Sequence, residues 1–400
     1  MLERVMIISG ESSGELYGAF LAGALKGHNP GTDIIGVGGA RMQSAGVKLI
    51  SGISSAFGLA ESLKTYRDIK KTYERAVAAL RTFKPQVLVL IDYPDFNMRV
   101  AREAKKSGIK ILYYVSPQVW AWRKNRVKVI GKLVDRMAVI LPFEEEIYRT
   151  ADIPCEFVGH PVMDEIREEL QGLGYGIQDL GAGELKKKVR RELGLIPARP
   201  VMALMPGSRP HEIAKLLPVM RGVITEMQRL YPDFQFIIPV APNLGNNVLS
   251  VMHNELEVFT RRSLLVTQHP IKALLASDAA VIASGTSTLQ AALLKVPMVV
   301  VYKISPLTYL IGKLIIKVEH ISLVNILLGK SVRDDSGLRI RELLQGNANK
   351  ANITAELSRI LDEPEYRNDM VSQLEKVGKL FVDKKASLRV LEIIEGLVIR

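Results

Sequence analysis

The stretch Val5-Met6-Ile7-Ile8-Ser9-Gly10-Glu11-Ser12-Ser13-Gly14-Glu15 decides the fold of this chain. Four apolar residues lead into a loop of small, hydroxyl-bearing and acidic residues, and an Ala/Leu-rich run with the composition of a helix then continues to Leu25. A strand that enters a helix through such a loop presents backbone N–H groups, which suit phosphate or polar sugar groups. Ser13, Gly14 and Glu15 are therefore candidate binding residues.

The second half of the chain repeats this unit. Val201-Met202-Ala203-Leu204 is followed by Pro206-Gly207-Ser208-Arg209, and a helix is expected from about His211 to Leu230. Short apolar segments bounded by turn residues predict strands at 4–8, 33–37, 86–91, 110–115, 136–140, 155–158, 200–205, 234–240, 263–267, 279–283 and 297–302. Because helical patterns such as 98–107 alternate with them, we predict an α/β protein with parallel sheets covered on both faces.

Four hundred residues are too many for one core and fit two domains. We predict an N-terminal Rossmann-like domain over 1–170 and a C-terminal Rossmann-like domain over 200–365, facing each other across a cleft. The Gly-rich stretch 171–183 lacks periodicity, so 171–199 is expected to be a linker or insertion. Residues 366–400 are expected to form helices that either pack on one domain or cross back to the first. Nucleotide-sugar glycosyltransferases are built in this way.

The composition narrows the cellular setting. A single cysteine, Cys155, excludes a disulfide framework and indicates a reducing compartment. We expect no signal peptide and no membrane-spanning segment, because the N-terminus lacks a basic and apolar leader and the longest apolar stretch, 304–328, is interrupted by charged residues. The net charge of +12 indicates an anionic partner. Because the sequence shows no nucleic-acid-binding signature, we favour a membrane surface and phosphorylated substrates over nucleic acid as this partner.

The loop Pro206–Arg209 is a candidate diphosphate site. Gly207 allows the backbone to approach a ligand, Ser208 can cap the following helix, and Arg209 offers a planar fork that matches a phosphate. The alternative is an ordinary helix cap beside a surface arginine.

A second candidate loop follows the predicted strand 279–283. Ser284, Gly285, Thr286 and Ser287 lead into a helix expected over 289–294, and Gln290 lies near its start. Open α/β sheets bind ligands at the carboxyl ends of their strands, so this loop and the preceding one are expected to hold a nucleotide together. A plain capping box is the alternative.

Asp92 directly follows an apolar strand and is our candidate general base. Sugar transfer with inversion needs one such carboxylate to take the proton of the acceptor hydroxyl. Asp95 is the rival, although it precedes a helix and can simply cap it. The further alternative is that neither residue is catalytic.

Trp120 and Trp122 lie beside Arg123, where they form either a substrate wall or the packing under a loop. His160 is either a cleft residue or a structural histidine. The sequence shows no metal signature, so positive charge on a leaving group has to come from Arg209, helix N-termini and Lys303.

Between Phe57 and Phe83, apolar residues that include Leu63, Tyr66, Ile69 and Tyr73 recur three and four positions apart among lysines and arginines. This pattern predicts an amphipathic helix whose apolar stripe either contacts a membrane or packs on the core. The stretch 304–328 is an interfacial loop, a dimer contact or a buried helix.

The motifs and their order along the chain resemble those of the lipid-A-disaccharide synthase family. Its members are inverting glycosyltransferases of the GT-B fold. The matching blocks run from Ser9 to Gln345 and are 9–15, 36–42, 92–97, 114–123, 141–143, 157–161, 206–209, 283–289, 322–325 and 342–345. The resemblance implies transfer of a sugar from UDP-2,3-diacylglucosamine to 2,3-diacylglucosamine 1-phosphate (lipid X), giving a β-1,6-linked disaccharide 1-phosphate and UDP. It also implies a metal-independent enzyme without a cofactor, peripheral on the cytoplasmic face of the inner membrane.

By the same resemblance, Asp92 is the base for the acceptor 6-hydroxyl, Arg209 belongs to the UDP site, and Asn325 and the 284–290 loop surround the nucleotide. The C-terminal segment can be exchanged between two subunits of a homodimer. The chain departs from the family at Glu15, where Asp is usual, and at Gln290, where Glu is usual. Two other hypotheses are a UDP-sugar 2-epimerase of the same fold and a non-catalytic membrane protein that binds nucleotide sugars.

Overall fold

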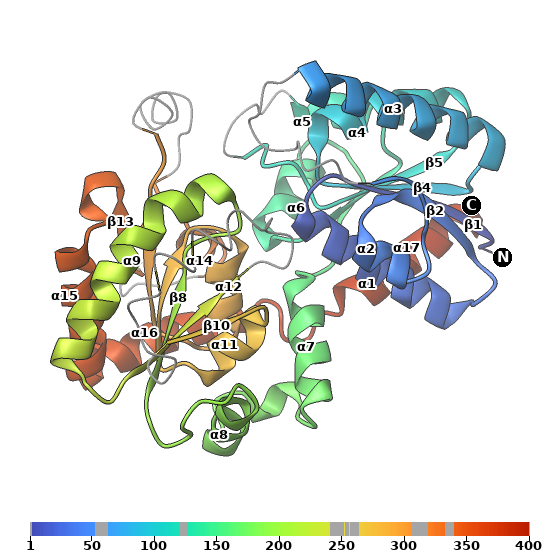
Figure 1. The fold of residues 1–400 in the computed structure, drawn as a ribbon. Helices are drawn as coiled ribbons and strands as arrows, with labels where there is room; N and C mark the ends of the chain where they lie inside the picture. Colours follow the sequence, from blue (N-terminus) through green and yellow to red (C-terminus); the bar gives the residue numbers. More distant parts are fainter. Residues whose placement is uncertain are drawn as a thin grey trace. The chain divides into compact units, whose positions relative to one another are not determined.

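The structure is a computed structural model that describes residues 2–52, 63–120, 126–240, 252, 256, 264–305, 319–332 and 340–399. The chain forms two compact units (Figure 1), which comprise residues 1–164 with 384–400 and residues 165–383. Each unit has its own parallel sheet. None of the helices in the described ranges is both long and apolar enough to cross a membrane.

The first unit is built on a seven-stranded parallel sheet in the order β3-β2-β1-β4-β5-β6-β7. All five residues of the central strand β4 are buried, as expected for a strand covered on both faces. The strands are β1 (Arg4–Ser9), β2 (Asp33–Gly38), β3 (Lys48–Gly52), β4 (Val87–Ile91), β5 (Lys110–Tyr114), β6 (Arg136–Val139) and β7 (Cys155–Phe157).

Helices cover both faces of this sheet. One face carries α3 (Leu63–Phe83), α4 (Pro94–Lys106) and α5 (Arg126–Gly131), and the other carries α1 (Ser12–His28) and the last helix, α17 (Ala386–Ile399) (Figure 1). Shorter helices are α2 (Ala40–Ser44) and α6 (Pro142–Arg149). The helix α7 (Val162–Gly172) begins in the first unit and continues into the second.

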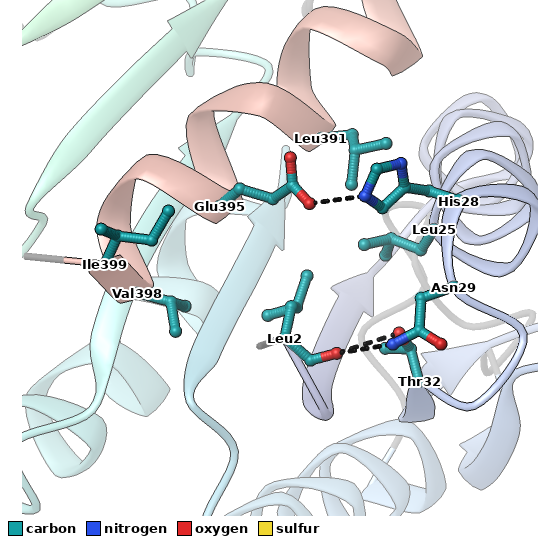
Figure 2. Close-up of a pocket in the computed structure, with 9 residues that line it drawn as sticks. All are labelled: Leu2, Leu25, His28, Asn29, Thr32, Leu391, Glu395, Val398 and Ile399. Atoms are coloured by element: carbon teal, nitrogen blue, oxygen red, sulfur yellow. Dashed lines mark hydrogen bonds and ion pairs between the residues drawn. The ribbon is translucent and has the colours of Figure 1, made fainter.

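The last helix packs on α1, β4 and β5 of its own chain. Figure 2 shows a pocket of about 310 Å³ between α17, α1 and the start of the sheet. An ion pair of 2.9 Å joins His28 Nε2 to Glu395 Oε1 at its rim, and Asn29 and Thr32 donate side-chain hydrogen bonds to the Leu2 carbonyl. Exchange of this C-terminal segment between two subunits stays a prediction.

The second unit contains a six-stranded parallel sheet in the order β10-β9-β8-β11-β12-β13. Its strands are β8 (Val201–Met205), β9 (Gln235–Pro239), β10 (Leu264–Thr267), β11 (Ala279–Ala283), β12 (Met298–Tyr302) and β13 (Glu342–Leu344). The chain adds strands on one side of β8 and then crosses to add β11 on the other. The carboxyl ends of β8 and β11 therefore flank the topological switch point, where open α/β sheets bind ligands.

The described helices of the second unit, besides most of α7, are α8 (Gly183–Glu192), α9 (Pro210–Leu230), α11 (Pro270–Ala276), α12 (Thr286–Leu293), α14 (Leu323–Lys330), α15 (Lys350–Asp362) and α16 (Pro364–Lys379). The predicted α/β fold class is confirmed. Two expectations are wrong in detail: the helix predicted from Met98 begins at Pro94, and the helix predicted from Leu289 begins at Thr286.

Candidate active site

The loop after β8 has the backbone that the sequence predicted at Gly207. Its φ of +110° lies in the region that glycine adopts without strain. A Cβ at this position would also meet the Glu212 carboxylate at 2.5 Å. Gly207 is therefore required by the turn itself.

The carboxylate of Glu212 occupies part of this loop. It accepts hydrogen bonds from the backbone N–H groups of Ser208 (3.2 Å) and Arg209 (3.3 Å), and it pairs with the Arg209 guanidinium at 3.3 Å. The N-cap of α9 is Arg209, so the expectation that Ser208 caps this helix is wrong. The Arg209 side chain remains half exposed, so its guanidinium is accessible to a ligand.

Tyr302 and Lys303 lie at the end of β12, next to β11 in the same sheet. Burial raises the pKa of Tyr302, the charge of Glu212 adds to the shift, and the charge of Arg209 opposes it. The charges of Glu212 and Arg209 therefore act on the end of β12 as well.

The loop after β11 supplies hydroxyl groups at the switch point. The Ser284 hydroxyl donates to the Ile321 carbonyl (3.1 Å), and Thr288 Oγ1 donates to the Gly285 carbonyl (2.8 Å). Ser284, Thr286 and Ser287 are partly exposed. Gln290 is 8% exposed, and its amide nitrogen donates to Glu165 Oε2 at 2.8 Å.

Asn325 is fully buried and its amide is used within the protein. The nitrogen donates to the Ile340 carbonyl (2.7 Å) and to Glu342 Oε1 (2.8 Å), while the oxygen accepts from the Ile340 N–H (2.9 Å). The Glu342 carboxylate also accepts from the backbone N–H groups of Ile321 and Ser322. In this arrangement Asn325 and Glu342 fix the start of α14. If the Asn325 amide contacted a ligand directly, it would have to give up one of these hydrogen bonds.

In the first unit, Asp92 lies at the carboxyl end of β4 in a left-handed conformation with φ of 49°, and Tyr93 follows with φ of 45°. Such conformations carry strain in non-glycine residues and are held by their surroundings. Here Tyr113 Oη and the Asn97 amide each donate to the Asp92 carbonyl at 2.7 Å. The backbone of Asp92 is therefore positioned by two side chains.

The rival carboxylate, Asp95, has a different environment. It lies in the first turn of α4, whose N-cap is Tyr93, so the expectation that Asp95 caps this helix is wrong. Its side chain is exposed and forms an ion pair with Arg126. Asp95 therefore joins α4 to α5 through an ion pair at the surface.

Glu144, which no sequence motif indicated, is a buried carboxyl after β6, two strands away from β4 in the same sheet. It lies in the first turn of α6, where Oε1 accepts from Trp120 Nε1 and Oε2 from the Leu141 N–H, both at 3.2 Å. Burial raises the pKa of Glu144 to about 8 and the charge of Asp92 adds to the shift, whereas the hydrogen bonds from Leu141 and Trp120 lower it. Glu144 therefore fixes the indole of the predicted substrate residue Trp120.

The first loop and His160 have structural partners. Glu15 Oε1 accepts from the backbone N–H of Arg41 (2.9 Å), at the start of α2, and Gly14 packs near Ile91. Ser13 is partly exposed. His160 is 2% exposed, and burial lowers its pKa to about 3, so it stays neutral at physiological pH.

The described part of the amphipathic helix packs inward. Ile69 and Tyr73 lie against the core of the first unit, which was the alternative to membrane contact for this stripe. The side chains of Leu63 and Tyr66 lie outside the described residues, as do Trp122, Arg123 and most of 304–328. In the described parts of the chain, no group of three or more His, Cys, Asp or Glu side chains is placed to hold a metal ion.

Comparison with known proteins covers nearly the whole chain. Residues 5–390 match the family model described as lipid-A-disaccharide synthetase. The chain is 39% identical over 398 residues to the lipid-A-disaccharide synthase of Geobacter sulfurreducens, covering 98% of this chain and 97% of the relative. It is 37% identical over 397 residues to that of Coxiella burnetii, with 98% of each chain covered.

Solved structures share the fold. A UDP-GlcNAc 2-epimerase from Neisseria meningitidis, bound to UDP-GlcNAc, superposes with a TM-score of 0.66 at 14% identity, covering 98% of this chain and 100% of the other. A glycosyltransferase from Rickettsia africae superposes with a TM-score of 0.55 at 11% identity, covering 99% of each chain. At these identities the likeness concerns the fold alone.

Proposed function

Because the chain belongs to the lipid-A-disaccharide synthase family, we propose that it transfers 2,3-diacylglucosamine from UDP-2,3-diacylglucosamine to lipid X and releases UDP. The chain is a glycosyltransferase of the GT-B type. The observation that carries the proposal is the family match over residues 5–390, which spans both units and the candidate loops of each. The epimerases resemble this chain only in fold.

We propose that the second unit binds the UDP moiety at the β8–β11 switch point. The half-exposed guanidinium of Arg209 can pair with a phosphate, and Lys303 adds charge at the neighbouring strand end. Ser284, Thr286 and Ser287 supply hydroxyl groups around the same point. Positive charge there favours departure of the nucleotide, because the diphosphate gains negative charge as its bond to the sugar breaks.

In the proposed reaction, the Asp92 carboxylate takes the proton of the acceptor 6-hydroxyl. The hydroxyl oxygen attacks the anomeric carbon of the donor and forms the new glycosidic bond. The bond from that carbon to the diphosphate breaks, and its electron pair leaves with UDP. A carboxylate held at a strand end suits this role because general bases need a fixed position within hydrogen-bonding distance of the proton.

Release of UDP in mixed micelles tests this proposal. We expect UDP to be released from UDP-2,3-diacylglucosamine only when lipid X is present, and we expect EDTA to leave the rate unchanged. An epimerase needs no acceptor and transfers no sugar to lipid X. With an epimerase, UDP release would therefore not depend on lipid X. Folded protein that releases no UDP with lipid X would contradict the proposed donor and acceptor.

We further propose that the protein works at an anionic membrane surface. The outward side of α3 carries the exposed residues Arg67, Lys70, Lys71, Arg75 and Arg81, whereas Glu74 is its exposed acidic residue. Basic side chains near an anionic bilayer contribute about 1 kcal/mol each. This charge would hold the first unit beside lipid substrates without a membrane-spanning segment.

Vesicle binding tests the role of this charge. Replacing Lys70, Lys71 and Arg75 with Gln should weaken binding to phosphatidylglycerol vesicles about 100-fold, from roughly 3 kcal/mol of lost attraction. Replacing Lys187, Arg191 and Arg199 with Gln removes the same charge from the second unit and should change binding little. Equal losses in both variants would mean that net charge, and not the α3 surface, controls binding.

A further inference from the structure

In the second unit, a carboxylate from a distant part of the sequence lies beside α12, the helix that follows the switch-point strand β11. Glu165 is on α7 and Gln290 is on α12, 125 residues later, and the amide of Gln290 donates to Glu165 Oε2 at 2.8 Å. Gln290 is 8% exposed, while Glu165 is partly exposed. The buried amide therefore holds a carboxylate that solvent can reach.

The position of this pair limits what the carboxylate can recognise. Gln290 lies one helical turn after Thr286, so the pair is next to the loop at the end of β11. A carboxylate repels phosphate and accepts hydrogen bonds from hydroxyl groups, so it suits the neutral part of a nucleotide. Two adjacent hydroxyls, as in a ribose, can donate to one carboxylate, and this pairing recurs in dinucleotide-binding folds.

We propose that Glu165 binds the ribose diol of the donor nucleotide, and that Gln290 is a positioning residue which orients its carboxylate. The inference rests on the proposed binding of UDP by the second unit and assigns one specificity-determining residue within it. A carboxylate has about four lone-pair sites, so it can accept from the Gln290 amide and from ribose hydroxyls at once. The alternative is that the pair only fastens α7 to α12.

Ribose analogues separate these two roles. We would measure the dissociation constants of UDP and of 2′-deoxy-UDP by calorimetry with the full chain. The wild-type protein should prefer UDP about ten-fold or more, because the analogue lacks one hydrogen bond to a charged group. Glu165→Gln should bring the preference close to one, mainly by weakening the binding of UDP. A purely structural pair would weaken both ligands alike and leave their ratio unchanged.

Two further variants serve as controls. Glu168→Gln removes an exposed carboxylate one turn along α7 and should keep the wild-type preference. Glu165→Ala combined with Gln290→Glu moves the carboxylate across the hydrogen bond and should restore much of the preference. This restoration is expected even if Glu165→Gln alone proves poorly folded.

The outcomes distinguish this inference from the function on which it rests. A wild-type protein without a preference for UDP, or a Glu165→Gln variant that keeps the preference, would overturn the role of Glu165 and leave the glycosyltransferase function intact. Failure of the folded wild-type protein to bind UDP would overturn the proposed donor site and this inference with it.

Discussion

The Asp92→Asn variant should lose about 10²- to 10⁴-fold in kcat, because an amide cannot take the proton of the acceptor hydroxyl. Asn is the substitution that least disturbs this position, since it tolerates the left-handed conformation that Asp92 adopts with φ of 49°. The hydrogen bonds from Tyr113 and Asn97 reach the carbonyl of residue 92, so they persist in the variant. The measurement is UDP release at saturating donor and lipid X.

Asp95→Asn is the matched control for this experiment. Its carboxylate lies three residues away but is exposed and paired with Arg126, so we expect turnover within a few-fold of wild type. UDP affinity should stay unchanged in both variants, because both substitutions are in the first unit. If Asp95→Asn loses turnover and Asp92→Asn keeps it, the two roles are exchanged. Retained turnover in Asp92→Asn alone would contradict the assignment of the base.

The sheets could be predicted from the sequence because their strands are short, continuous apolar runs. All eleven predicted strands occur in the described structure, most with ends displaced by one residue. The two that were missed, β3 and β13, are both edge strands. Each is partly exposed and mixes polar with apolar residues, so it lacks the pattern of a strand buried on both faces.

The candidate site was predictable to the extent that its residues follow strands directly. Asp92 directly follows β4 and Ser284 directly follows β11, so each lies at the edge of its own sheet where the parallel strands end. Local motifs carried no information about the partners of these residues. Glu144, Glu165 and Glu342 were missed as site residues, and each holds a predicted residue by a hydrogen bond that spans between 17 and 125 positions.

The sequence also did not show which predicted binding residues have partners within the protein. Pro206–Arg209 was expected to present backbone donors, yet Glu212 accepts two of them within the first turn of α9. A capping box of this kind is compatible with the sequence, since the acidic residue stands three positions after the N-cap. Competition between an internal carboxylate and a ligand depends on side-chain geometry, which the spacing of residues does not determine.

The second large effect that we expect concerns stability. Asp278→Ala should lower the free energy of unfolding of the second unit by about 3–5 kcal/mol. The Asp278 carboxylate accepts hydrogen bonds from Arg190 (2.5 Å), Lys186 (2.9 Å) and the Val201 N–H (2.8 Å), so it joins α8 to the start of β8. Arg190 is 6% exposed and also donates to the Ala276 and Pro197 carbonyls. In the variant, the buried guanidinium of Arg190 keeps these two carbonyl acceptors but loses the negative charge that balances it.

Urea unfolding of two further variants identifies the cause of this loss. Glu375→Ala removes a carboxylate of the same unit whose pair with Lys295 is exposed, and it should cost about 1 kcal/mol or less. Arg190→Met removes the buried charge itself, so the Asp278→Ala and Arg190→Met double variant should lose less stability than the sum of the two single variants. Additive losses would mean that Asp278 acts mainly through the Val201 N–H. A loss for Asp278→Ala as small as that for Glu375→Ala would contradict a buried ion pair at this position.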